Sequence, residues 1–271
     1  MSKIAAIQTN ASDDIEQNLV DVRAQIDRAK EQGAELIVLP ECFGLMQSSR
    51  RQLLQCAEQD GQGKIQDFLS AIANSRNVWI IGGSVPLKSS HPTKVTNTLL
   101  AYDNNGNRVA RYDKIFLFDV TLSGGECYCE SDYTEPGNSF EVMDSPLGKI
   151  GLSICYDLRF PEMYRKLTQL GARILVVPAA FSQTTGQSHW LPLLTARAIE
   201  NGCFVVAAAQ TGVHNRARKT WGHTVIIDPW GKVISELQSE CGVVIADIDL
   251  DLLQRIREQL PSLKHCRPDL F

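Results

Sequence analysis

The stretch Glu35-Leu-Ile-Val-Leu-Pro40 has a counterpart in Arg173-Ile-Leu-Val-Val-Pro178. Each is a short run of branched apolar residues, which is typical of a β-strand. A second pair of segments precedes them in the same order, because Lys3-Ile-Ala-Ala-Ile-Gln8 resembles Lys149-Ile-Gly-Leu-Ser-Ile154. A helical pattern and a glycine separate the members of each pair. The chain therefore repeats a strand–helix–strand unit.

The repeat continues beyond these strands. Val78-Trp-Ile-Ile-Gly82 matches Cys203-Phe-Val-Val-Ala207, and Tyr102-Asp-Asn-Asn-Gly106 matches the turn Ile227-Asp-Pro-Trp-Gly231. Both turns place glycine where a hairpin requires it. The two halves thus read as one β-α-β-α-β-β unit used twice. This pattern predicts an α/β fold, a four-layer α-β-β-α sandwich with an internal pseudo-two-fold repeat, in which residues 1–271 form a single domain.

Apolar runs and helical periodicity define the expected elements. In the first helix, Ile15, Leu19, Val22 and Ile26 recur at steps of three to four and mark one buried face. We expect helices at Asp13–Gln32, Gly63–Ser75, Pro161–Leu170, Trp190–Asn201 and Leu250–Gln259. We expect strands at Ile4–Gln8, Leu36–Pro40, Val78–Gly82, Asn97–Tyr102, Lys149–Cys155, Ile174–Val177, Cys203–Ala209, Thr224–Asp228 and Val243–Asp247.

Composition narrows the function classes. The 271 residues include 27 Lys and Arg against 31 Asp and Glu, a net charge of −4, so nothing points to nucleic acid or an anionic membrane as a partner. The start of the chain lacks the apolar core of a signal peptide, and eight cysteines without such a leader suggest free thiols in a cytoplasmic protein. Cys127 and Cys129 are the one close pair, which is a weak zinc signal, and we expect no metal.

Three residues in the sequence are candidates for a catalytic role. Glu41 ends an apolar strand, at the edge where α/β sheets build sites, although it could equally cap a loop. Lys114 follows a hairpin and taken alone reads as a surface charge. Cys155 stands between a strand and the helix that begins near Pro161, where the local field would stabilise a thiolate; its alternative role is that of a small buried apolar residue.

Together these residues carry a family resemblance. Leu39-Pro-Glu41, Tyr112-Asp-Lys114 and Ile154-Cys-Tyr-Asp-Leu-Arg-Phe-Pro-Glu162 resemble, in this order, the Glu–Lys–Cys triad motifs of the nitrilase superfamily, the carbon–nitrogen hydrolases. The resemblance extends from Ile4 to about Phe271. It implies the four-layer sandwich, an amidase that needs no cofactor, and a homodimer or higher homo-oligomer with C-terminal tails that reach across. It assigns Glu41 as the base, Lys114 as the oxyanion stabiliser and Cys155 as the nucleophile.

Further segments are similar to the Nit branch of that family, among them Ala180-Phe-Ser-Gln-Thr-Thr-Gly-Gln-Ser-His-Trp190 and Ala207-Ala-Ala-Gln-Thr-Gly212. This similarity implies a small-molecule amide substrate. We favour deaminated glutathione, whose hydrolysis releases 2-oxoglutarate and cysteinylglycine in metabolite repair. The alternative is an ω-amidase that acts on 2-oxoglutaramate or 2-oxosuccinamate. An inactive binding scaffold is disfavoured, because none of the three triad residues is lost.

The resemblance also suggests residues around the triad. Glu130 and Tyr156 would position the substrate or Lys114. Arg159 is expected to clamp the 2-oxo acid carboxylate with two parallel hydrogen bonds, although it could instead pair with Asp157 or Glu162. Phe181 and Thr185 would line the pocket. The long segment 119–148 reads as a functional loop or lid, open to the leaving group.

Overall fold

In the computed structural model, residues 2–122, 125–215 and 218–267 are described. Two sheets face each other. In each sheet the strands from the repeated segments lie side by side in the order that the repeat predicts. The first sheet runs β17-β1-β2-β3-β5-β4, with β6 paired to β5. Its strands are β1 (Ser2–Gln8), β2 (Leu36–Val38), β3 (Trp79–Ile81), β4 (Val85–Lys88), β5 (Val95–Tyr102), β6 (Arg108–Asp113) and β17 (Gly242–Ile248).

The second sheet runs β16-β15-β12-β11-β10-β9. Its strands are β9 (Val142–Met143), β10 (Ile150–Leu152), β11 (Ile174–Val176), β12 (Phe204–Ala207), β15 (Val225–Ile227) and β16 (Val233–Glu236). Two small antiparallel ribbons stand apart from the sheets. They consist of β7 (Asp119–Thr121) with β8 (Cys127–Cys129), and of β13 (Thr211–His214) with β14 (Arg218–Trp221).

The internal repeat is confirmed in the strand directions. β1, β2 and β3 are parallel neighbours, and so are β10, β11 and β12. In each sheet the next strand turns back, because β5 is antiparallel to β3 and β15 is antiparallel to β12. The predicted hairpins follow at Gly106 and Gly231, whose φ angles of 80° and 89° suit glycine.

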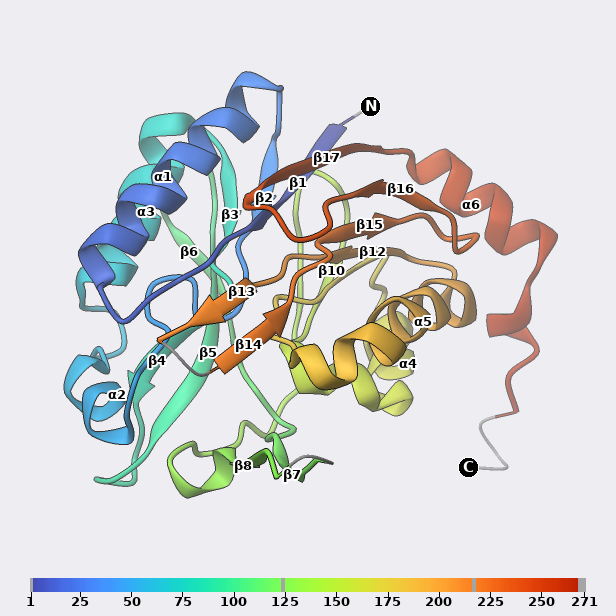
Figure 1. The fold of residues 1–271 in the computed structure, drawn as a ribbon. Coiled ribbons are helices and arrows are strands. Elements are labelled where there is room, and N and C mark those ends of the chain that lie inside the picture. Colours follow the sequence, from blue (N-terminus) through green and yellow to red (C-terminus); the bar gives the residue numbers. More distant parts are fainter. Residues whose placement is uncertain (1, 123–124, 216–217, 268–271) are drawn as a thin grey trace.

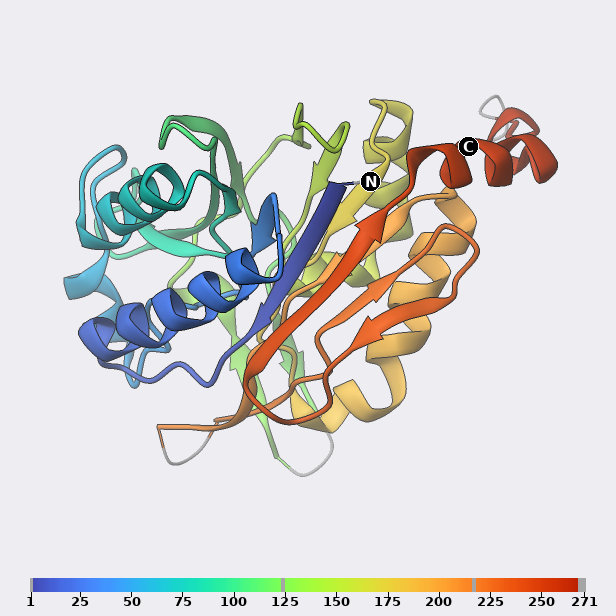
Figure 2. The ribbon, with the colours of Figure 1, turned by 90° about the horizontal axis from the view of Figure 1, so that it is seen from above.

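Helices cover the outer face of each sheet (Figures 1 and 2). α1 and α3 pack on the first sheet, whereas α4 and α5 pack on the second. α6 extends from the end of β17 at one corner of the molecule (Figure 2). The helices are α1 (Ile15–Glu31), α2 (Arg50–Cys56), α3 (Lys64–Arg76), α4 (Pro161–Gln169), α5 (Gln183–Asn201) and α6 (Leu250–Gln259).

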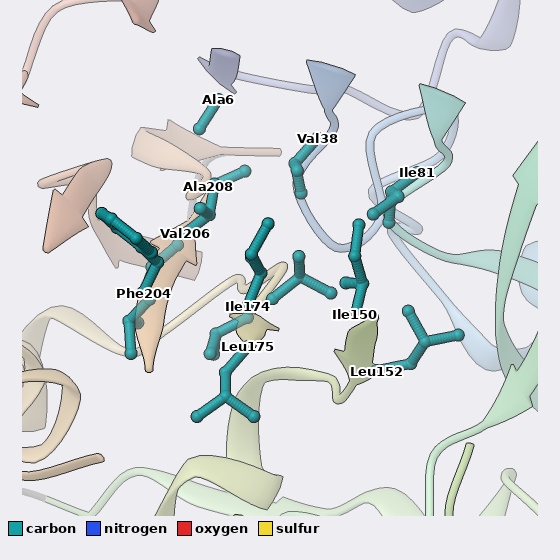
Figure 3. Packing of buried hydrophobic residues seen from close by; sticks show 14 of the residues in the cluster. Ala6, Val38, Ile81, Ile150, Leu152, Ile174, Leu175, Phe204, Val206 and Ala208 are labelled. Carbon is teal, nitrogen blue, oxygen red and sulfur yellow. The ribbon is translucent and has the colours of Figure 1, made fainter. Parts of the chain in front are cut away.

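The core lies between the sheets and beneath the helices. Side chains alternate along a strand, so that Val38 of β2 faces the second sheet while Ile37 faces α1 and α3. Figure 3 shows Ala6, Val38 and Ile81 opposite Ile150 of the second sheet. Because the central strands are buried on both faces, they are apolar throughout, which is why the sequence pattern found them.

Two expectations need correction. α5 begins at Gln183 rather than Trp190, so the Gln-Thr-Thr-Gly segment is part of the helix. Gly186 permits this packing, because a Cβ there would overlap Trp221 of β14. The segment 119–148 is not one irregular loop, since it holds β7, β8, β9 and a short 3₁₀ turn.

Some of the expected features lie outside the described residues. These are positions 123–124 of the expected loop and 268–271 of the expected C-terminal tail. Within the described ranges, no helix combines the length and the apolar composition needed to cross a membrane.

Candidate active site

Glu41 lies just after β2, where the chain leaves the first sheet, and it is 3% exposed. Its Oε1 accepts hydrogen bonds from Asn97 Nδ2 at 2.9 Å and Lys114 Nζ at 3.1 Å. Its Oε2 accepts one from the backbone N–H of Ala180 at 2.8 Å. Burial opposes ionisation, but the charges of Lys114 and Arg218 hold the pKa of Glu41 below its usual range. Glu41 is therefore an ionised, fixed carboxylate.

Lys114 follows β6 and is buried between two carboxylates. Its Nζ lies 3.1 Å from Glu41 Oε1 and 2.9 Å from Glu130 Oε2. Glu130 begins the 3₁₀ turn Glu130–Asp132 and also accepts a hydrogen bond from the backbone N–H of Phe118 at 2.7 Å. Burial alone would lower the pKa of Lys114, but Glu130 and Glu41 hold it well above its usual value. The ammonium is thus charged and fixed in direction.

Cys155 starts the 3₁₀ turn Cys155–Arg159, shortly after β10. Its φ of 49° lies in the left-handed region that residues with a Cβ rarely adopt. Its backbone N–H donates to the carbonyl of Pro178 at 2.9 Å, which ties the turn to the end of β11. The thiol lies within hydrogen-bonding reach of the Glu41 carboxylate. The strained backbone thus aims the sulfur at the candidate base.

The protonation state of Cys155 differs from the sequence-based expectation. Burial and the negative charge of Glu41 raise the pKa of the Cys155 thiol well above its usual value, against the opposing effect of Lys114. The expectation that the strand-to-helix turn stabilises a thiolate is therefore wrong for the resting site. A thiol beside a carboxylate can become nucleophilic only by passing its proton to that carboxylate.

Asp157 braces the turn that carries Cys155. Its carboxylate accepts hydrogen bonds from Tyr112 Oη at 2.6 Å and from the backbone N–H groups of Ile154 at 2.8 Å and Phe116 at 3.1 Å. Since Tyr112 lies on β6, two residues before Lys114, this buried pair links the turn to the strand that presents the lysine. The sequence contained both residues within the quoted motifs, but their pairing was not predicted.

The eight predicted site residues line one cleft. The structure thus brings together residues from both halves of the chain. They are Glu41, Lys114, Glu130, Cys155, Tyr156, Arg159, Phe181 and Thr185.

Arg159 lies on an aromatic part of the cleft wall. Its guanidinium carbon is 5.7 Å from the ring centre of Tyr156 and 5.2 Å from that of Phe181, and Nη1 lies 3.3 Å from His189 Nδ1. In the described structure it forms no ion pair with Asp157 or Glu162, the partners of the alternative interpretation. Its charge therefore remains available to an anionic ligand.

Thr185 lies in the first turn of α5 and lines the same cleft. Its Oγ1 is buried and finds no hydrogen-bond partner among the described residues. An unpaired buried hydroxyl is costly, and a ligand that bonds to it would remove that cost.

Sequence reasoning missed two further residues of the cleft. Asn97 donates to Glu41, but it lies inside the apolar strand β5, where nothing marked it. Arg218 begins β14 and lines the cleft, and its Nη2 donates to the carbonyl of Ala180 at 3.3 Å. Because β14 itself was not predicted, no sequence signal placed Arg218 near the triad.

Within the described ranges, no cluster of three or more His, Cys, Asp or Glu side chains is arranged to hold an ion. Cys127 and Cys129 are exposed on β8.

Comparison with known proteins identifies relatives of the chain. Residues 3–258 match the carbon–nitrogen hydrolase family. The deaminated glutathione amidase of Synechocystis sp. is 41% identical over 264 residues, covering 96% of each chain. The deaminated glutathione amidase of Homo sapiens is 38% identical over 272 residues, covering 99% of this chain and 83% of that one.

Solved structures are similar along the whole fold. The NitFhit protein of C. elegans superimposes with a TM-score of 0.92 at 36% identity, covering 100% of this chain and 66% of that one. A mutant amidase from Nesterenkonia sp. AN1 superimposes with a TM-score of 0.79 at 29% identity, covering 96% of this chain and 98% of that one. That structure shows Michael addition of acrylamide at the active-site cysteine.

Proposed function

Because the chain belongs to the carbon–nitrogen hydrolase family and is an amidase of that family, we propose that it hydrolyses deaminated glutathione to 2-oxoglutarate and cysteinylglycine. The observation that carries the proposal is the convergence of Glu41, Lys114 and Cys155 on one cleft. The names of the relatives and the free positive charge on the cleft wall support an anionic amide as substrate.

The first step forms an acyl-enzyme. As Cys155 Sγ attacks the amide carbon, its proton passes to Glu41, which lies within hydrogen-bonding reach. The carbonyl oxygen gains the negative charge and is stabilised by the Lys114 ammonium and the backbone N–H that follows Cys155. The C–N bond then breaks, and Glu41 returns the proton to the departing amine of cysteinylglycine.

The second step frees the enzyme. Water attacks the thioester carbon while Glu41 takes one of its protons. The C–S bond breaks, 2-oxoglutarate leaves, and the proton returns from Glu41 to the sulfur of Cys155. Glu130 acts as a positioning residue in both steps, because it holds Lys114 at 2.9 Å.

Recognition of the acyl half is assigned to the side of the cleft that carries Arg159. The guanidinium lies over Tyr156 and Phe181, which leaves its edge to bind the 2-oxo acid carboxylate in two parallel hydrogen bonds. The unpaired hydroxyl of Thr185 is a donor for the same group. This assignment suits both candidate substrates, because they share the 2-oxoglutaryl group.

The deciding experiment compares kcat/KM for deaminated glutathione and 2-oxoglutaramate side by side. The proposal expects a higher value for deaminated glutathione. A higher value for 2-oxoglutaramate would show an ω-amidase instead. Turnover of neither compound, with no acyl adduct on Cys155, would leave a binding scaffold as the function.

We also propose that the enzyme is a homodimer. Large apolar side chains are exposed near α6, with Trp230 60%, Leu260 54% and Ile199 48% exposed. They border a hollow on the surface, and exposed apolar surface of this kind is typical of interfaces. Sedimentation should show twice the 30.0 kDa chain mass, and Trp230→Lys should shift the protein toward monomer. A wild-type monomer would contradict the proposal.

A further inference from the structure

Arg218 is the cation of the cleft that the proposed mechanism leaves unused. Lys114 is paired with two carboxylates, and Arg159 packs on two aromatic rings. Among the described residues, the Arg218 guanidinium donates only to a backbone carbonyl, that of Ala180, and has no carboxylate within ion-pair distance. A guanidinium stays charged at any physiological pH, so this charge awaits an anion from outside the protein.

The position of Arg218 points to one half of the substrate. It interacts electrostatically with Cys42, Glu41 and Cys155, and it lowers the pKa of the Glu41 carboxyl. Glu41 is the group that returns the proton to the departing amine, so the leaving group must lie beside it. Arg159, in contrast, belongs to the turn that begins with Cys155. Both arginines line the cleft that holds Glu41 and Cys155.

We propose that Arg218 is a specificity-determining residue that binds the terminal carboxylate of the leaving group. The inference rests on the proposed function. Deaminated glutathione carries two carboxylates, one on the 2-oxo acid and one on the terminal glycine. The cleft offers two arginines outside the triad, Arg159 and Arg218. 2-Oxoglutaramate releases only ammonia and has no second carboxylate for Arg218 to bind.

The reach of the leaving group fits this assignment. Two extended residues span at most about 7 Å, so the glycine carboxylate of cysteinylglycine ends about that far from the scissile nitrogen. Arg218 lines the same cleft as Glu41 and Cys155 and interacts electrostatically with both. Because this carboxylate is remote from the reacting bond, its binding changes little between ground state and transition state. Loss of Arg218 should therefore appear mainly in KM.

The test compares deaminated glutathione with its C-terminal carboxamide, which differs only in the charge of the leaving group. The wild-type enzyme should prefer the carboxylate form. Arg218→Gln should reduce that preference in kcat/KM by about 10- to 100-fold, the effect of a charge-assisted hydrogen bond. The loss should lie in KM, and Arg218→Lys should restore part of it. Lys219→Gln is the matched control, since it removes an exposed charge from the same strand and should keep the preference.

One result would contradict the role proposed for Arg218. If Arg218→Gln lowers kcat for both compounds by the same factor, Arg218 acts only through the charge of Glu41 and the inference is wrong. Circular dichroism of the variant shows whether the fold persists. Failure of the proposed function is a different observation, because it appears in the wild-type enzyme as a higher kcat/KM for 2-oxoglutaramate than for deaminated glutathione.

Discussion

Glu41 and Lys114, 73 residues apart in the sequence, form a buried ion pair with 3.1 Å between Oε1 and Nζ. The pair fixes the charges around Cys155 before any substrate arrives. A second carboxylate, that of Glu130, also holds the lysine. Burial and the negative charge of Glu41 keep the neighbouring thiol protonated, which makes proton transfer part of the attack.

Cys155→Ala should abolish amidase activity and leave the fold intact. The variant removes the sulfur but keeps the Cβ, so the backbone at φ 49° is unchanged. Intact-protein mass spectrometry of the wild type with a slowly hydrolysed substrate should show an acyl adduct that the variant lacks. Cys241→Ala, at an exposed cysteine, is the control and should behave as wild type. Robust turnover by Cys155→Ala would show that Cys155 is not the nucleophile.

Glu41→Gln should lower kcat by about 10²–10⁴, the usual contribution of a general base. It should also destabilise the protein, because Asn97, Lys114 and Ala180 all donate to this side chain and a glutamine offers them one acceptor instead of two. Steady-state kinetics and thermal denaturation measure the two effects. Near wild-type kcat would place the proton transfer elsewhere.

Lys114→Met should lower kcat by at least about 10²–10³, as loss of an oxyanion donor does. It also leaves two buried carboxylates unpaired, which costs about 3–5 kcal/mol in the free energy of unfolding. Adding Glu130→Gln to this variant should recover part of the stability and none of the activity. Urea denaturation and kinetics separate the two roles, and recovery of activity in the double variant would contradict them.

Arg159→Lys should lower kcat/KM for deaminated glutathione and 2-oxoglutaramate alike. A lysine cannot form the two parallel hydrogen bonds to a carboxylate, and charge-assisted bonds are worth about 1.5–3 kcal/mol, or about 10- to 100-fold. The ratio between the substrates should hardly change, which distinguishes this residue from Arg218. Normal cleavage of both compounds would show that Arg159 serves only the packing of Tyr156 and Phe181.

Asp157 should make the free energy of unfolding depend on pH. Burial raises the pKa of Asp157 to about 6 in the folded protein, above the usual value of 3.8. The folded state therefore holds this proton more tightly than the unfolded state, and the stabilising effect is complete below about pH 4 and is lost as the pH rises through about 6. The difference corresponds to about 3 kcal/mol.

The matched variant for this effect is Asp157→Asn, which cannot titrate. The difference in unfolding free energy between wild type and variant should fall by about that amount between about pH 4 and pH 7. Tyr112→Phe supplies a second measurement, because its hydroxyl lowers the pKa of Asp157 and its loss should move the transition to higher pH. A difference that is constant with pH would show that Asp157 is ionised throughout.

The sequence predicted the parts of the fold that are buried on both faces. All nine expected strands overlap observed ones, because strands such as β2 and β11 are apolar throughout. The strands that were missed lie at edges or in ribbons. β6 and β14 contain Arg, Lys and Asp in place of an apolar run, so their periodicity is lost. Helix α2 is only seven residues long and buries one side chain, Leu53.

A similar distinction, between local sequence pattern and tertiary structure, explains which site residues could be predicted. Glu41, Lys114 and Cys155 occur within motifs whose residue types reveal the chemistry. Asn97 and Arg218 act through positions that only the tertiary structure creates, since β5 and β14 come from different halves of the chain. The raised pKa of Cys155 is likewise a tertiary effect, because it depends on burial beside Glu41.

The carboxylate of Glu41 takes its hydrogen bonds from both repeats, from Asn97 and Lys114 of the first and from Ala180 of the second. A newly synthesised chain in which one repeat has folded and the other has not therefore holds Cys155 without an oriented base. Such an intermediate would have an ordinary, unreactive thiol. Catalytic competence would then arise only when the two repeats dock, so the return of activity during refolding would report the last assembly event.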